Sequence, residues 1–250
     1  MVTIKHLSKN SMILAAVLIL VVPLHHAQAT IIEFGNNLIE NGDAELGDGS
    51  NGYAYVDVPV WTNLEGGMTV VSYGATLFPN SQSPGPEDRG NNFFSGGNNH
   101  VYSSANQIID VSGLAVEIDQ GIVTFDLSGY IGGYHNHEDN ATLTALFQDS
   151  SGDVLGSATI GQVSVSDRDT VTGLLFQDSQ GFLPTETRQI EVVLKMNRVH
   201  GAYNDGYADN LSLVLVPLPS TFLLLGMGIV AMRKYQRISR RPQRTIHKQS

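Results

Sequence analysis

A polar turn runs directly into an alternating apolar segment at Asn204-Asp205-Gly206-Tyr207-Ala208-Asp209-Asn210-Leu211-Ser212-Leu213-Val214-Leu215-Val216. Every second residue over 211–215 is leucine, which is the period of a half-buried β-strand. Tyr207 and Asp209 share the parity of these leucines, so we expect both side chains to face the core. An unpaired buried carboxylate is costly. Asp209 therefore needs a cation, backbone N–H groups or a basic partner; the alternative is that it caps the loop entering the strand.

A second polar stretch opens the chain at Asn37-Leu38-Ile39-Glu40-Asn41-Gly42-Asp43-Ala44-Glu45, and acidic loop residues continue to Asp48. An opening N-L-x-x-N-G-x-x-E combined with a closing Y-x-D-N-L-S-L resembles the galactose-binding-like β-sandwiches. These are jelly rolls that include many carbohydrate-binding modules. The resemblance implies an all-β jelly-roll sandwich, although Ala44 stands where that family usually has an aromatic residue.

Many members of that superfamily hold a structural calcium ion between their first and last strands. Carried over by the resemblance, the charged ligands are Glu45 and Asp209, and backbone carbonyls near Asn41 and Asp43 complete the shell. Calcium takes six to eight oxygen ligands. We therefore expect a structural Ca²⁺ where the two acidic stretches meet.

The acidic charge of the chain is confined to its middle. All 24 Asp and Glu residues lie within 33–209, where only five basic residues occur, so this body carries a net charge of −19. Such a body repels nucleic acid and anionic lipid and attracts cations. The sequence has no cysteine, which excludes disulfides as a source of stability.

The first 29 residues have the features of a secretory signal. Lys5 and Lys9 precede an apolar run over 12–24, and Ala-Gln-Ala at 27–29 is an A-x-A cleavage site. The alternative, a transmembrane anchor, needs about 20 apolar residues. We expect a signal peptide and helix over 1–29, one sandwich domain over 30–216 and a separate tail over 217–250.

The tail begins with a short motif, followed by an apolar run over 222–232 that we expect to form a short hydrophobic helix, and a basic cluster from Arg233. It resembles the PEP-CTERM sorting signal, with Leu218 in place of the motif glutamate. The resemblance implies an exosortase-type sorting enzyme as partner, transient or permanent membrane anchoring through 219–232, and a location at the surface or in the extracellular matrix of a bacterium. The alternative is a disordered basic tail. The motif residues are Val216, Pro217, Pro219, Ser220 and Thr221.

Short alternating segments separated by Gly, Asn, Asp and Ser indicate an all-β sandwich or barrel. Trp61 is expected in the core, 78–99 is expected to be one long loop, and no amphipathic helix is evident. Besides the closing strand, we expect strands over 53–58, 68–73, 107–111, 122–131, 141–148, 154–162 and 189–199.

The candidate ligand-binding residues cluster in a Gly-rich loop over 132–140. His135 and His137 at i and i+2 could chelate a transition metal if that segment is a strand; the alternative is a solvated polar loop. Tyr134 and Tyr203 lie in polar loops and could stack on sugar rings. No nucleophile elbow, zinc-protease motif or phosphate loop occurs.

The sequence therefore favours a non-catalytic, exported protein that binds carbohydrate, such as the exopolysaccharide of the cell itself. Two alternatives stay open. One is a structural surface or matrix protein without a small ligand, and the other is a glycan hydrolase whose carboxylate pair cannot be singled out by counting.

Overall fold

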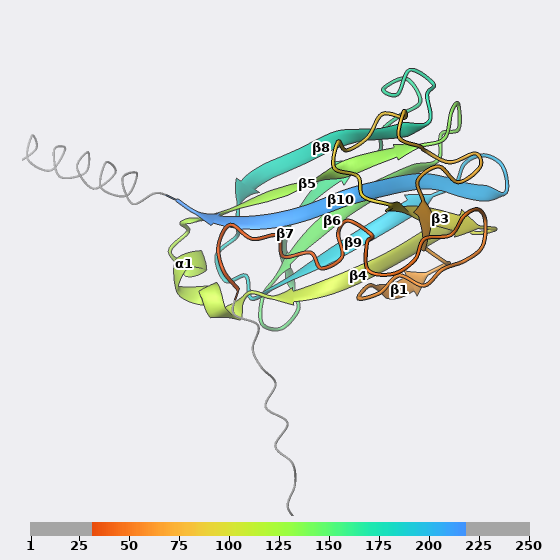
Figure 1. Ribbon diagram of the computed structural model, residues 1–250. Helices are drawn as coiled ribbons and strands as arrows, with labels where there is room; N and C mark the ends of the chain where they lie inside the picture. Colours follow the sequence, from red (N-terminus) through yellow and green to blue (C-terminus); the bar gives the residue numbers. More distant parts are fainter. Residues whose placement is uncertain (1–31, 219–250) are drawn as a thin grey trace, which may run out of the picture. The chain divides into compact units, whose positions relative to one another are not determined.

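The computed structural model describes residues 32–218, which form two antiparallel five-stranded sheets (Figure 1). The first, called here the β10 sheet, has the order β2 (Thr69–Ser72), β3 (Asn92–Asn98), β10 (Tyr203–Pro217), β5 (Val123–Gly133) and β8 (Gly173–Phe182). The second, the β9 sheet, has the order β1 (Thr62–Glu65), β4 (Tyr102–Asp110), β9 (Gln189–Asn197), β6 (Asn140–Gln148) and β7 (Val154–Gly161). A short helical turn, η1 (Ser112–Leu114) and α1 (Ala115–Asp119), connects β4 to β5.

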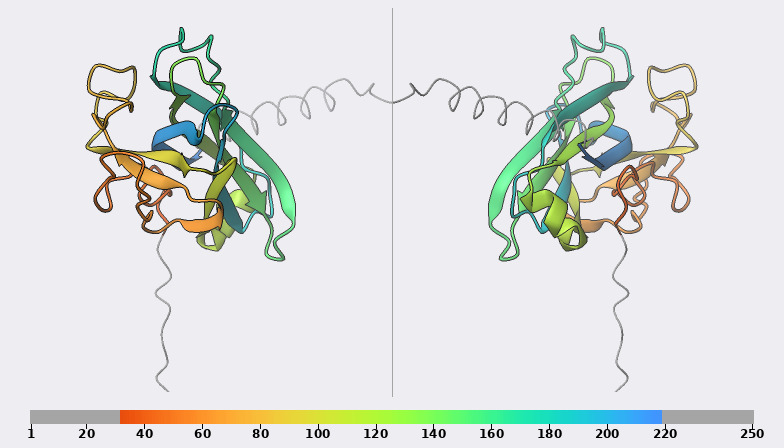
Figure 2. Two further views of the ribbon diagram at one scale, coloured as in Figure 1. Left: turned by 90° about the vertical axis from the view of Figure 1, so that its right-hand side faces the viewer. Right: turned by 90° about the vertical axis from the view of Figure 1, so that its left-hand side faces the viewer.

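The core lies between the two sheets, which Figure 2 shows from either end of the strands. Leu143 on β6 and Leu194 on β9 face Leu127 on β5 and Leu213 on β10, and all four are fully buried. Burying a leucine side chain contributes about 1.5–3 kcal/mol. The alternating pattern of these strands therefore produces the all-β sandwich, and this prediction is confirmed.

A β-bulge in β10 reverses the parity expected for its first half. Asp209 pairs with Tyr130 and Ser212 pairs with Ser128. An advance of three residues along β10 therefore matches an advance of only two residues along β5. Asn210 supplies the extra residue, with a φ of 47°. The expectation that Asp209 and the leucines share one face is therefore wrong, because one inserted residue moves all preceding side chains to the opposite face.

The first half of β10 consequently supports a second apolar cluster on the outer face of its sheet. Val70 and Phe94 pack in the inter-sheet core, whereas their neighbours Val71 and Phe93 pack outside it. The loop between β2 and β3 folds over this face. The cluster comprises Val71, Ala75, Phe78, Phe93, Leu174, Tyr203 and Tyr207.

Several expected elements differ from the structure. Residues 53–58 are not a strand, because Val56 is tied to the Thr69 hydroxyl through both its N–H (2.8 Å) and its C=O (3.1 Å). The expected loop over 78–99 contains β3, and β8 and α1 were not anticipated. Trp61 is buried as expected, and its indole N–H donates to the carbonyl of Asn41 over 3.3 Å.

The expected signal helix, the short apolar helix of the tail, and Pro219, Ser220 and Thr221 lie outside the described residues. Val216 and Pro217 are the last two residues of β10. Within 32–218, no helix has the length and apolar character needed to cross a bilayer.

Candidate functional site

A hollow of about 360 Å³ opens at the end of the sandwich where β10 begins. We call it the aromatic hollow. Its walls come from five separate segments of the chain. The lining residues are Tyr53, Leu77, Asn98, Tyr134, His137, Gly201, Ala202, Tyr203 and Asp205.

Contacts between aromatic rings hold the wall of the aromatic hollow in place. The ring centroids of Tyr53 and Tyr203 lie 5.1 Å apart with a tilt of 56°, and Phe78 packs against both rings. Such tilted pairs are favourable beyond the area they bury. Tyr203 is buried, but 49% of Tyr53 is exposed, so Tyr53 presents an accessible ring at the entrance.

Arg168 positions the loop that follows β5. Its buried guanidinium donates to the carbonyls of Gly133 (3.1 Å), His135 (3.0 Å) and His137 (3.0 Å). His135 has a φ of 40° and an exposed side chain that does not line the hollow. Of the four residues proposed from sequence for ligand binding, Tyr134, His137 and Tyr203 meet in the hollow and His135 does not.

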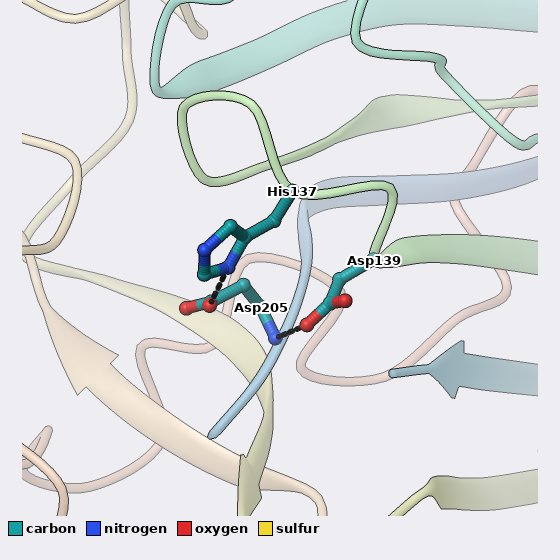
Figure 3. Close-up of side chains that lie close together, drawn as sticks. All are labelled: His137, Asp139 and Asp205. Carbon is teal, nitrogen blue, oxygen red and sulfur yellow. Dashed lines mark hydrogen bonds and ion pairs between the residues drawn. The ribbon is translucent and has the colours of Figure 1, made fainter. Parts of the chain in front are cut away.

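A polar network joins the floor of the aromatic hollow to the interior (Figure 3). His137 Nδ1 lies 3.0 Å from Asp205 Oδ2. The Tyr207 hydroxyl donates to Asp205 Oδ1 over 2.7 Å. The backbone N–H of Asp205 donates to Asp139 Oδ2 over 2.9 Å. Burial raises the pKa of Asp205, and the hydrogen bonds from Tyr207 and His137 oppose that rise.

A second hollow, of about 400 Å³, separates the opening stretch from the bulge of β10. We call it the acidic hollow. Backbone hydrogen bonds from Leu38 to Leu213 and from Leu211 to Gly42, both of 2.8 Å, bring the two stretches together. Among its lining residues are the oxygen-bearing side chains of Asn37, Asn41, Asp43, Glu45, Asp88 and Asn210.

The carboxylate of Glu45 already has several donors. The backbone N–H groups of Asn91 and Asn92 each donate to its Oε1 over 2.8 Å, and Asn91 Nδ2 donates to Oε2 over 3.1 Å. Asn41 Oδ1 accepts from the N–H of Leu46 over 2.9 Å. Glu45 thus fixes the loop before β3, and it also lines the acidic hollow.

Asp209 does not line the acidic hollow. Its Oδ2 accepts from the Tyr73 hydroxyl over 2.6 Å and its Oδ1 from the N–H of Asn210 over 2.8 Å. Burial, with a further contribution from Glu45 and Asp43, raises the pKa of Asp209 to about 8 against these hydrogen bonds. The hollow itself presents Asp43, Glu45 and Asp88 with amide oxygens, a donor set that fits a hard cation such as Ca²⁺. Arg89 also lines the hollow, but its guanidinium donates to the carbonyls of Asn80, Ser83 and Pro86.

Sequence reasoning missed three residues that shape these sites. Asp139 is fully buried in the polar network, Asp88 accepts from Asn210 Nδ2 over 2.9 Å, and Arg168 anchors the loop after β5. Arg168 had one available signal, since it is among only five basic residues in a strongly acidic body. Asp139 lies in the loop over 132–140 that was singled out for its potential ligands, although it was not itself selected. Asp88 had no signal, because acidic residues are abundant throughout that body.

No protein-family model matches this sequence, and no curated protein sequence matches it. Among solved structures, the tailspike protein 4 enzymatically active domain of bacteriophage CBA120 is 14% identical with a TM-score of 0.44, covering 72% of this chain but only 21% of the phage chain. A Stig cyclase from Fischerella sp. TAU is 13% identical (TM-score 0.47), with 73% of this chain and 98% of the cyclase covered.

A xylan-binding CBM22-1 domain from Paenibacillus barcinonensis is 15% identical with a TM-score of 0.38, covering 75% of this chain and 99% of that domain. The three neighbours differ in their named activities and are all distant. At these identities and TM-scores they assign no function, which has to be inferred from the two hollows of this chain.

Proposed function

We propose that this chain is an exported, non-catalytic glycan-binding protein whose aromatic hollow receives sugar residues of a polysaccharide. One observation carries the proposal. The rings of Tyr53, Tyr134 and Tyr203 surround a space of about 360 Å³ that also exposes polar atoms of His137 and Asp205. Small-ligand pockets typically measure about 300–1,000 Å³ and combine apolar walls with a few polar groups.

The chemistry of a sugar suits this combination. The C–H faces of a pyranose ring are apolar and pack on aromatic rings, while its hydroxyls need hydrogen-bond partners. Asn98, His137 and Asp205 provide such partners at the edge and floor. The net charge of −19 over residues 33–209 disfavours a polyanionic glycan. A neutral polysaccharide, such as an exopolysaccharide of the same cell, is therefore the proposed ligand.

The rest of the proposal concerns placement and stability. The A-x-A site and the sorting-type tail support export, followed by handling by an exosortase-type enzyme at the cell surface or in the matrix. The oxygen donors of the acidic hollow support a structural Ca²⁺ ion held by Asp43, Glu45 and Asp88. Such an ion would tie the opening stretch to the last strand.

Affinity electrophoresis of the full chain in gels containing neutral polysaccharides tests glycan binding. Removing an aromatic anchor typically costs at least 1–2 kcal/mol, so Tyr53→Ala should weaken binding by about tenfold or more. Tyr102→Ala is the matched control, because Tyr102 is 45% exposed, lies on β4 and does not line the hollow. Wild-type migration that no glycan retards, or equal losses in both variants, would refute the proposed site.

The His137–Asp205 pair favours a second candidate, a glycan hydrolase. A carboxylate that orients an imidazole beside a hollow is the arrangement of a general acid–base group. New reducing ends appearing during incubation with a bound polysaccharide, and lost in His137→Gln, would establish catalysis. Binding without product formation supports the non-catalytic proposal.

A further inference from the structure

We infer that His137, Asp139 and Asp205 form a binding site for a divalent first-row transition-metal ion at the floor of the aromatic hollow (Figure 3). One potential ligand atom from each residue lies within 4.8 Å of the other two. His137 comes from the loop after β5, Asp139 precedes β6, and Asp205 lies in β10. This site is separate from the acidic hollow and does not depend on glycan binding.

The donor types select the class of metal. An imidazole nitrogen with two carboxylate oxygens suits Zn²⁺, Mn²⁺, Co²⁺ or Ni²⁺, whereas Ca²⁺ and Mg²⁺ prefer oxygen ligands alone. His137 Nδ1 and Asp205 Oδ2 lie 3.0 Å apart. Two ligands of a tetrahedral ion at about 2.0–2.1 Å lie roughly 3.3 Å from each other. These two atoms are therefore already near the spacing that an ion requires.

Both carboxylates are held by the outer contacts that orient metal ligands in proteins. Asp139 Oδ1 accepts from the N–H groups of Val199 (2.6 Å) and His200 (2.7 Å), and Asp139 Oδ2 accepts from the N–H of Asp205. The hydroxyl of Tyr207 fixes Asp205. These donors leave lone pairs on the carboxylates for a cation and restrict the rotation of both side chains.

Charge balance supports a cation at this position. Asp139 is fully buried and Asp205 is 7% exposed, and two adjacent buried carboxylates require positive charge. The nearby guanidinium of Arg168 donates its hydrogen bonds to backbone carbonyls, not to either carboxylate. Within residues 32–218, the only ion-pair partner of Asp205 is His137. Arg168 places one positive charge near Asp139 and Asp205, but Glu138 also lies near it. A divalent ion would supply the positive charge that is still missing.

The site is accessible to an ion. His137 and Asp205 both line the aromatic hollow, so an ion can enter from solvent and keep water in its remaining positions. On its other side, the ring of His137 stacks on His200, with centroids 5.6 Å apart and planes inclined by 27°. This packing restricts the orientation of the imidazole that the ion would use.

The experiment uses the full chain, stripped with a chelator and titrated with Zn²⁺ in a calorimeter and with Co²⁺ under visible absorption. We expect one saturable Zn²⁺ site and Co²⁺ d–d bands. Because losing an outer contact already costs 10–100-fold in metal affinity, His137→Gln should weaken this site at least 100-fold. Two controls should leave it unchanged: His135→Gln in the same loop, and Asp43→Asn in the acidic hollow.

Absence of a saturable Zn²⁺ site, or equal affinity in His137→Gln, would show that His137 and Asp205 are only an ion pair. If circular dichroism shows that His137→Gln does not fold, Tyr207→Phe decides, because it keeps all three ligands and removes one hydroxyl. Affinity about tenfold lower in folded Tyr207→Phe supports the site, and unchanged affinity overturns it. No glycan is present, so neither result bears on carbohydrate binding.

Discussion

The hydroxyl of Tyr73 donates a 2.6 Å hydrogen bond to the buried carboxylate of Asp209, across 136 positions of sequence. The bond links the loop after β2 to the bulged part of β10. Asp209 therefore has a hydrogen-bond partner from a distant segment of the chain. Its pKa of about 8 means that the carboxyl is largely protonated at neutral pH when no cation is bound.

This protonation predicts how the stability of chelator-treated protein depends on pH. The pKa of Asp209 rises from an ordinary 3.8 to about 8 on folding, so the folded state binds the extra proton between these values. The free energy of unfolding should then fall as pH rises from 4 to 8, by up to about 1.4 kcal/mol per pH unit. Urea unfolding of Asp209→Asn should show a flatter profile, while Asp153→Asn, an exposed loop change, should keep the wild-type slope.

Calcium should stabilise the chain through the acidic hollow. An ion that binds only the folded state at a hundredfold excess over its dissociation constant adds about 2.7 kcal/mol, which corresponds to roughly 5–10 °C in Tm for a domain of this size. Asp43→Asn should remove most of this shift in differential scanning calorimetry, and Asp153→Asn should retain it. A wild-type Tm that is the same in calcium and in EDTA would refute the calcium proposal.

Arg168 should be important for stability. Arg168→Met leaves the carbonyls of Gly133, His135 and His137 without their donor, so we expect a loss of roughly 2–4 kcal/mol in chemical unfolding. Arg188→Met is the matched control, because Arg188 pairs with Asp119 at the surface and should contribute little. Equal stability of the two variants would show that the loop after β5 holds its shape without Arg168.

Export should remove both ends of the chain. The A-x-A site at 27–29 and the basic-flanked tail predict a mature form that begins at Thr30 and lacks residues 233–250. Intact-mass spectrometry of the protein recovered from its native envelope or medium measures this directly. A mass that still includes 1–29 or 233–250 would contradict the account of that end.

The sequence was informative where one face of a strand is buried. Alternation along residues 141–148 and 189–199 predicted β6 and β9, because their inward residues fill the space between the sheets. The alternation failed at residues 53–58, where Val56 bonds to the hydroxyl of Thr69 and not to a neighbouring strand. It also failed to predict β8, an edge strand whose partly exposed residues show little apolar alternation.

The candidate sites were predictable only in part. Tyr134 and Tyr203 were selected because they were expected in polar loops, and His137 was selected as a possible metal ligand. All three line one hollow, although Tyr203 is the first residue of β10. Asp209 faces the opposite side of β10 from Leu211, Leu213 and Leu215 because of a single bulge. The alternating pattern of β10 does not predict that bulge. The roles of Asp139 and Arg168 depend on contacts between distant segments, which a single sequence does not contain.

The extra residue at Asn210 lets one strand serve two environments. Beyond it, the leucines of β10 face the interior, and before it Tyr203 and Tyr207 face the outer side of the same sheet. Substitutions of the leucines therefore act on the core between the sheets, whereas substitutions of Tyr203 and Tyr207 act on the outer apolar cluster. The outer face of β10 can therefore change in sequence while its leucines continue to hold the two sheets together.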